Sequence, residues 1–226
     1  MIASLLDMRR TLMRRSIRFA AALGFAAAAL PVFLMWLSGP TGSAAPDWIY
    51  MNILAIGTGQ KHEVAAYVAL PFAVAIGLIV YLAGSRSLWD FFITALFSTA
   101  AAYCAMWVSV QIGPYATIFN SGLAPNDFLS NEKAVLAAIV ASLFPGAIGA
   151  GITWFGVVCA STNARNLIGG LATMSVGGII GTGDLLLPGI LTHAYGQDVG
   201  KFGTDVIMLA WQPAIAAMMA YCLSPR

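Results

Sequence analysis

Long stretches of apolar, nearly uncharged sequence restrict what this chain can fold into. A backbone that crosses a lipid bilayer must satisfy its own hydrogen bonds, so only helices and closed barrels span it. The apolar stretches here are continuous rather than alternating, which favours helices over barrel strands. The chain is 60% hydrophobic and only 9% charged, whereas soluble domains carry roughly 25% charged residues. We therefore expect an all-α integral membrane protein.

Six of these stretches are long enough to cross a hydrocarbon layer of about 30 Å as helices. The stretch 187–194 has two interpretations, because it can extend the fifth helix past Pro188 or lie at the membrane interface. The predicted fold is a single transmembrane domain over residues 19–226, preceded by a short basic segment over residues 1–18. The predicted helices cover residues 19–37, 64–83, 88–112, 134–158, 167–187 and 205–223.

The basic residues predict how the helices are oriented. With six spans, all the arginines fall on the side of the chain ends and of the turns near Arg86 and Arg165, and all the lysines fall on the other side. Short cytoplasmic loops carry an excess of basic residues. We therefore expect both termini in the cytoplasm, and we expect the protein in the inner membrane of a bacterium.

Loop lengths predict which helices are neighbours. The cytoplasmic turns 84–87 and 159–166 are short, so each should join two antiparallel helices that pack together. Either Asn163 or Asn166 is expected to cap the following helix, because an asparagine side chain accepts hydrogen bonds from the first helical amides. The loops on the other side are longer and rich in glycine, proline, asparagine and serine, which predicts irregular structure.

Residues 1–18 have three interpretations. As a helix, the segment places apolar residues on one side and four arginines on the other, and such a helix would lie on the cytoplasmic leaflet. In that case anionic lipid would bind at Arg10, Arg14, Arg15 and Arg18. The arginines can instead serve only to set the topology. In the third interpretation, the segment and the first apolar stretch form a secretion signal that is cleaved near residues 43–45.

The last three predicted helices contain residues that open a helix backbone. Proline and clustered glycines free backbone carbonyl groups, and transporters build solute sites from such interrupted helices. Asp184 is the only acidic residue in its apolar stretch, and carboxylates within membrane helices usually serve a pathway, a partner or an ion. We expect a transport pathway or gate here. The candidate residues are Asp184, Gln212, Pro213, Gly181, Gly183 and Pro145.

The predicted topology puts Asp184 near the outer end of its helix, where histidine and acidic residues could form a vestibule. The vestibule candidates are His62, Glu63, His193 and Asp205. No metal-ligand spacing such as His-x-x-x-His is present, so we predict no metal site. Alternatively, Asp184 is an interfacial carboxylate that caps a helix or pairs with Lys201.

Small residues recur at four-residue spacing in the fifth predicted helix, at Gly169, Thr173, Gly177 and Gly181. This pattern is typical of membrane helices that pack closely together. Packing is therefore a sufficient explanation for these glycines, whether or not a solute site lies beside them.

Two functional hypotheses remain after the motifs are considered. The sequence has no Gly-x-Ser-x-Gly, His-Glu-x-x-His or phosphate-loop motif, so an enzyme is not favoured and no cofactor or nucleic-acid partner is predicted. The first hypothesis is a transporter or channel for a small solute or ion, with its pathway near the last three helices. The second is a non-catalytic subunit or assembly factor of a larger membrane complex. Either could be a homo-oligomer.

Overall fold

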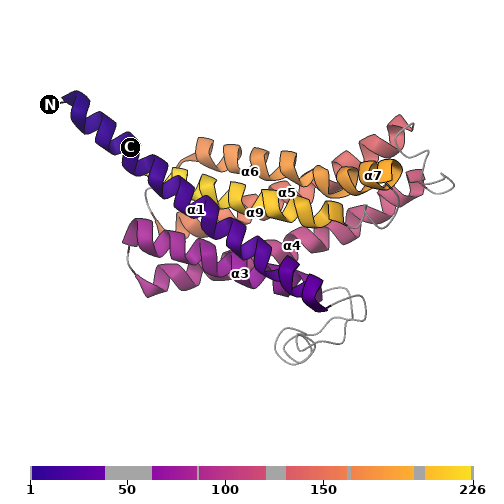
Figure 1. Ribbon diagram of the computed structural model, residues 1–226, viewed down its shortest axis with the longest axis horizontal. Helices are drawn as coiled ribbons and strands as arrows, with labels where there is room; N and C mark the ends of the chain where they lie inside the picture. The colour runs from indigo at the N-terminus through magenta and orange to yellow at the C-terminus, as the bar shows by residue number, and fades with distance from the viewer. Residues whose placement is uncertain are drawn as a thin grey trace.

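The computed structural model describes residues 2–38, 63–85, 87–120, 131–161, 164–195 and 202–224. Within these residues the chain is helical and contains no strand. The helices form an elongated bundle, and α7 turns aside at one end of it (Figure 1). The elements are α1 (Ile2–Ser38), α3 (Glu63–Val80), the π-helical turn η2 (Tyr81–Ser85), α4 (Leu88–Asn120), α5 (Glu132–Ala160), α6 (Leu167–Gly181), α7 (Gly183–Tyr195) and α9 (Phe202–Leu223).

The described residues contain 5 helical segments that are long and apolar enough to cross a membrane. These segments are Arg15–Phe33, Leu88–Ala105, Glu132–Ala160, Leu167–Tyr195 and Val206–Leu223. A shorter apolar segment, Ala69–Ala83, lies where the second span is predicted. The prediction of an all-α fold is thus confirmed for the described residues, and the apolar helices support a membrane protein by their length and composition. The number of six crossings and the orientation of the termini stay predictions.

Two helices extend past their predicted ends. α4 continues to Asn120, through Gly113 and Pro114, where the sequence predicts a loop. Of the two interpretations of residues 187–194, the structure shows the helical extension, because α7 continues through Pro188 to Tyr195. Glycine and proline are tolerated within membrane helices because neighbouring groups satisfy the freed backbone, so they are weaker stop signals than in water.

A single residue, Thr182, separates α6 from α7. Thr182 keeps helical torsion angles, with φ −58° and ψ −26°. Its backbone amide donates to the carbonyl oxygen of Gly178 at 2.9 Å, and its hydroxyl donates to that of Ile179 at 2.6 Å. The chain therefore bends at Thr182 without losing its helical course, and α6 and α7 together occupy the single fifth span that the sequence predicts.

α1 is continuous across residue 18, where the basic segment was expected to meet the first span. Its first turns project beyond the ends of the neighbouring helices (Figure 1). The side chains of Arg15 and Arg18 are exposed, while those of Arg10 and Arg14 lie outside the described part of the chain. The binding of anionic lipid at these arginines stays a prediction.

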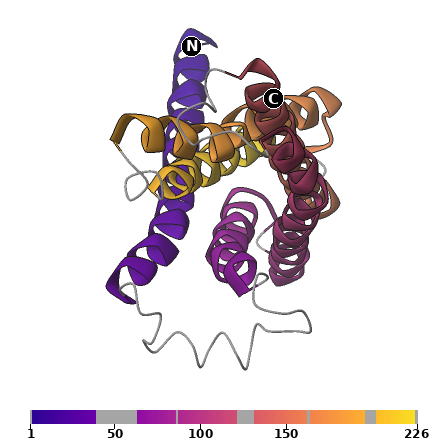
Figure 2. The same cartoon turned by 90° about the vertical axis from the view of Figure 1, so that its right-hand side faces the viewer.

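The helices that are joined by short turns pack against each other. α3 packs against α4, and α5 packs against α6, as the short turns predict. Asn166 caps α6, because its Oδ1 accepts a 3.2 Å hydrogen bond from the amide of Ile168. α9 contacts α1, α3, α5, α6 and α7, and it crosses α1 in the end-on view (Figure 2). α9 is therefore the central helix of the fold.

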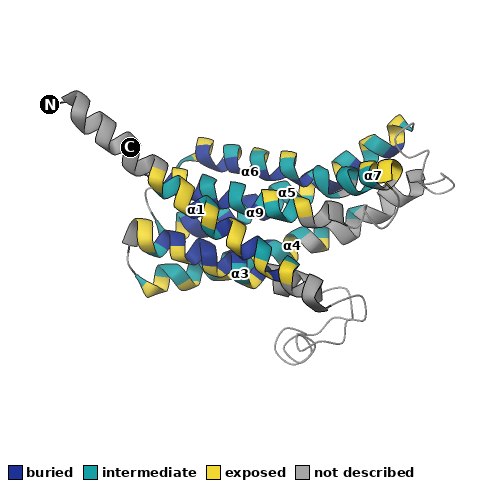
Figure 3. Cartoon of the chain, in the orientation of Figure 1, coloured by how far each residue is buried: buried dark blue, intermediate teal, exposed yellow. Residues whose placement is uncertain are grey.

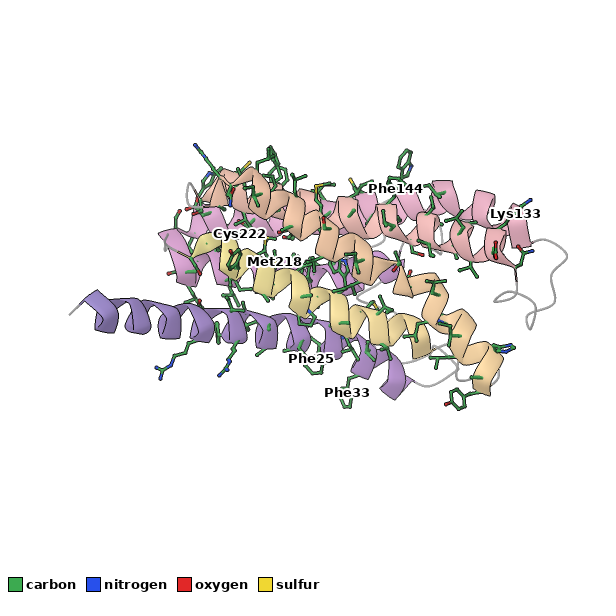
Figure 4. The ribbon with its side chains drawn as sticks, turned by 90° about the horizontal axis from the view of Figure 1, so that it is seen from above. Phe25, Phe33, Lys133, Phe144, Met218 and Cys222 are labelled. Atoms are coloured by element: carbon green, nitrogen blue, oxygen red, sulfur yellow. The ribbon has the colours of Figure 1, made fainter. Side chains whose placement is uncertain are left out.

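The core follows the inner side of α9 and the helices around it. Ile76, Ile215 and Met219 are fully buried in one apolar cluster, and buried residues face the inside of the bundle along its length (Figure 3). Large apolar side chains also cover the outside. Phe25, Phe33 and Phe144, which are 52%, 55% and 48% exposed, point away from the bundle (Figure 4). An apolar outer surface of this kind suits contact with lipid.

Candidate functional site

Trp211 of α9 joins three other helices near the middle of the bundle. Its Nε1 donates a 3.0 Å hydrogen bond to the carbonyl oxygen of Gly177 in α6. The indole ring also packs against Phe72 of α3, with ring centroids 5.5 Å apart. A Cβ added at Gly149 of α5 would lie 3.6 Å from the same indole. One side chain thus positions α9 against α3, α5 and α6.

The next two residues of α9 meet α1. A Cβ added at Gly24 would lie 2.7 Å from the Cα of Pro213 and 2.8 Å from the carbonyl oxygen of Gln212. Gly24 is the central residue of the apolar segment Arg15–Phe33, so this contact falls halfway along the first span. Pro213 has no amide hydrogen, which deprives the carbonyl group of Leu209 of its usual helical donor.

Gln212 carries a buried acceptor that has no donor. Its side chain is only 3% exposed, and Oε1 makes no hydrogen bond. Leaving such an atom unpaired costs about 1–3 kcal/mol. The adjacent indole has a single N–H group, which is already bonded to Gly177, and Pro213 supplies none. The segment Trp211–Pro213 therefore presents an unused acceptor where several helices meet, and we call this segment the α9 junction.

Two other buried atoms in the described part of the chain lack a hydrogen-bond partner. They are Oγ of Ser98 in α4 and Nε1 of Trp154 in α5. The Trp154 ring would lie 2.8 Å from a Cβ added at Gly170, in the first turn of α6. Gly170 precedes Gly177 by about two turns. These atoms therefore do not supply the missing donor at the α9 junction.

The small residues of α6 are buried within the bundle. A Cβ added at Gly146 of α5 would collide with the carbonyl oxygen of Gly177, and one added at Gly181 would lie 3.0 Å from the Cα of Gly146. The hydroxyl of Thr173 donates to the carbonyl oxygen of Gly169 at 2.7 Å. α5 and α6 therefore meet backbone to backbone. We call the contact between Gly146, Gly177 and Gly181 the glycine crossing.

The two candidate prolines have different surroundings. Pro145 directly precedes Gly146, so it lies at the glycine crossing and removes one amide from α5 there. Pro213 lies beside the side-chain amide of Gln212, whose oxygen is unpartnered. The structure thus brings Gln212 and Pro213 together at one place, and it puts Pro145 and Gly181 at another.

Asp184 lies in the first turn of α7 and is half-buried. The preceding residue, Gly183, packs against the side chain of Ile207, in the second turn of α9. Asp184 therefore follows a residue that packs against α9 about one helical turn before the α9 junction.

The vestibule candidates are described only in part. His193 lies in the last turn of α7 and is exposed. His62, Lys201 and the side chains of Glu63 and Asp205 lie outside the described residues. Among the residues that are described, no three His, Cys, Asp or Glu side chains gather into a group that could hold a metal ion.

Three residues that shape the α9 junction were not among the sequence candidates: Trp211, Phe72 and Gly24. Trp211 carried a usable signal, because a tryptophan inside a span is unlike the interfacial tryptophans of membrane proteins. Gly24 lies in an alanine-rich stretch, where one more small residue is not distinctive. Phe72 is one of several aromatic residues in an apolar helix, and nothing local marks it.

Comparison of this chain with known families, curated proteins and solved structures finds no match.

Proposed function

We propose that this chain is a small transporter or channel in a bacterial inner membrane, with a solute pathway that passes the α9 junction. The observation that carries the proposal is the buried, unpartnered Oε1 of Gln212. In hydrocarbon no bulk water is available to satisfy such an atom. A solute or water molecule that enters the pathway would supply the donor, so the atom is satisfied only when the pathway is occupied.

The topology that accompanies this proposal has six crossings with both termini in the cytoplasm. α3 and η2 together cover residues 63–85, and at about 1.5 Å per residue they are long enough to form the second predicted span, which would bring the number of crossings to six. The start of α1, the end of α9 and the joints between α3 and α4 and between α5 and α6 share one end of the bundle (Figure 1). An even number of crossings produces this arrangement. The exposed Arg15, Arg18 and Arg165 then become cytoplasmic, and Arg15 and Arg18 would contact anionic lipid.

The alternative is a subunit or assembly factor that docks another membrane protein through its small-residue faces. Gly177 and Gly181 already pack against Gly146 of the same chain, so these glycines are not free to receive a partner helix. This observation favours transport over docking through α6. A homo-oligomer that forms through other helices is compatible with either function.

The test is reconstitution of the purified protein in liposomes, with flux measured for water, small neutral solutes, ammonium and small anions. We expect flux of at least one of these in the wild type and its loss in Asp184→Asn. A matched control is Glu132→Gln, which neutralises an exposed carboxylate at one end of α5 and should leave flux unchanged.

Purification in mild detergent separates the two functions. A homogeneous protein that conducts a solute supports the proposal. A stoichiometric second protein that co-purifies, together with no flux from the isolated chain, would contradict it and favour the subunit function.

A further inference from the structure

We infer that the pathway takes hydrogen-bond donors, favours cations and excludes anions. This inference rests on the proposed function and names the solute class for the same site. It comes from the kind of polar group that the described part of the bundle presents to its interior. At the α9 junction the unpartnered group is an oxygen atom, and the half-buried charged side chains of the described residues are carboxylates.

The α9 junction offers acceptors. Oε1 of Gln212 is buried without a donor, and Pro213 cannot donate to the carbonyl oxygen of Leu209. The indole N–H beside them is already bonded to Gly177 at 3.0 Å. A solute that reaches this segment finds the unpartnered Oε1 of Gln212, to which it can donate, and the indole donor is not available to it.

The distribution of charged side chains also favours a cation over an anion. Among the described side chains, the basic ones are all exposed: Arg15, Arg18, Lys133, Arg165 and His193. The charged side chains that are half-buried are the carboxylates of Asp90 and Asp184. An anion among the described side chains would lose its hydration without meeting a buried cation, which is strongly unfavourable. A cation would meet carboxylates and acceptor oxygens.

Asp184 lies where it can act on a solute that approaches the α9 junction. Gly183, the residue before it, contacts Ile207. Ile207 is followed by Met208, which is half-buried and precedes Gln212 by one helical turn. A charged probe at Met208 should therefore be influenced by the Asp184 carboxylate, while Asp90 begins α4 at the other end of the bundle (Figure 1).

The experiment measures how fast charged thiol reagents modify a cysteine at Met208. The native cysteines are first replaced (Cys104→Ser, Cys159→Ser, Cys222→Ala), and Met208→Cys is added. Two methanethiosulfonates of similar size are compared in membranes, one with a trimethylammonium group and one with a sulfonate group. Each rate is divided by the rate of the same reagent with free cysteine. Ile215→Cys, at a fully buried position in the core, serves as the unreactive control.

We expect the cationic reagent to modify Met208→Cys about tenfold faster than the anionic one after this correction. Adding Asp184→Asn should bring the two rates close together, whereas adding Asp90→Asn should leave the preference unchanged. Equal rates in the Met208→Cys protein, or a faster anionic reagent, would overturn the inference while leaving a pathway in place. If neither reagent reacts with Met208→Cys, the pathway itself is absent and the proposed function falls with the inference.

Discussion

The glycine crossing and the α9 junction both bring helix backbones into direct contact, yet they differ in polar side chains. At the glycine crossing, Gly146, Gly177 and Gly181 contribute only backbone, and the carbonyl oxygen of Gly177 accepts from Trp211. At the α9 junction, Gly24 and Pro213 touch as closely, but Gln212 beside them keeps an unpartnered oxygen. Glycine and proline therefore indicate where helices meet, and the unpartnered oxygen of Gln212 is what distinguishes the α9 junction from the glycine crossing.

This difference changes how the glycines before Asp184 are interpreted. They hold α6 against α5, and the bend at Thr182 follows immediately after them. Asp184 then begins α7, on a segment that leaves the line of α6 (Figure 1). The glycines position Asp184 without forming a site of their own.

The largest expected loss of unfolding free energy is at the glycine crossing. Gly146→Ala places a methyl group against the carbonyl oxygen of Gly177, where neither backbone can easily move, so we expect a loss of about 2–3 kcal/mol in unfolding free energy. The matched control is Gly149→Ala, three residues away on α5, where the nearest atom to the new Cβ is 3.4 Å away. Reversible unfolding in detergent measures both. Equal losses in the two variants would show that the crossing is not tightly packed.

A smaller loss of unfolding free energy is expected at the hydrogen bond between Trp211 and Gly177, which joins the α9 junction to the glycine crossing. Trp211→Phe keeps an aromatic ring beside Phe72 but removes the N–H group that binds Gly177, and such a bond within a membrane protein is worth about 0.6 kcal/mol on average. Trp107→Phe is the control, because Trp107 is 62% exposed. The same unfolding assay compares them. If Trp107→Phe destabilises the protein as much as Trp211→Phe, the bond to Gly177 does not couple the two regions.

The helical fold was predictable because hydropathy and loop length report directly on which segments lie in lipid. The packing of α5 against α6 follows from local sequence in the same way, and the sequence narrowed the cap to Asn163 or Asn166, of which the structure shows Asn166. The extension of α7 to Tyr195 was left open, because Pro188 ends helices in water more reliably than in a bilayer.

The partners at the α9 junction were harder to predict. Which side of an apolar helix faces a neighbour depends on its rotation about its own axis, and a helix that is apolar all round does not fix that rotation. Gly24 and Phe72 are therefore found only from the packed structure. Gln212 was predictable, because a side-chain amide inside a span must either find a partner or serve a function.

The most direct test of the account is Gln212→Met, a substitution of similar length that removes the unpartnered oxygen from the α9 junction. Unfolding free energy and solute flux are measured on the same preparation. The account predicts stability that is unchanged or raised by up to about 1 kcal/mol, because a buried unsatisfied acceptor is lost, together with loss of flux. A protein that becomes less stable while flux persists would contradict it, since Gln212 would then support the fold and not the pathway.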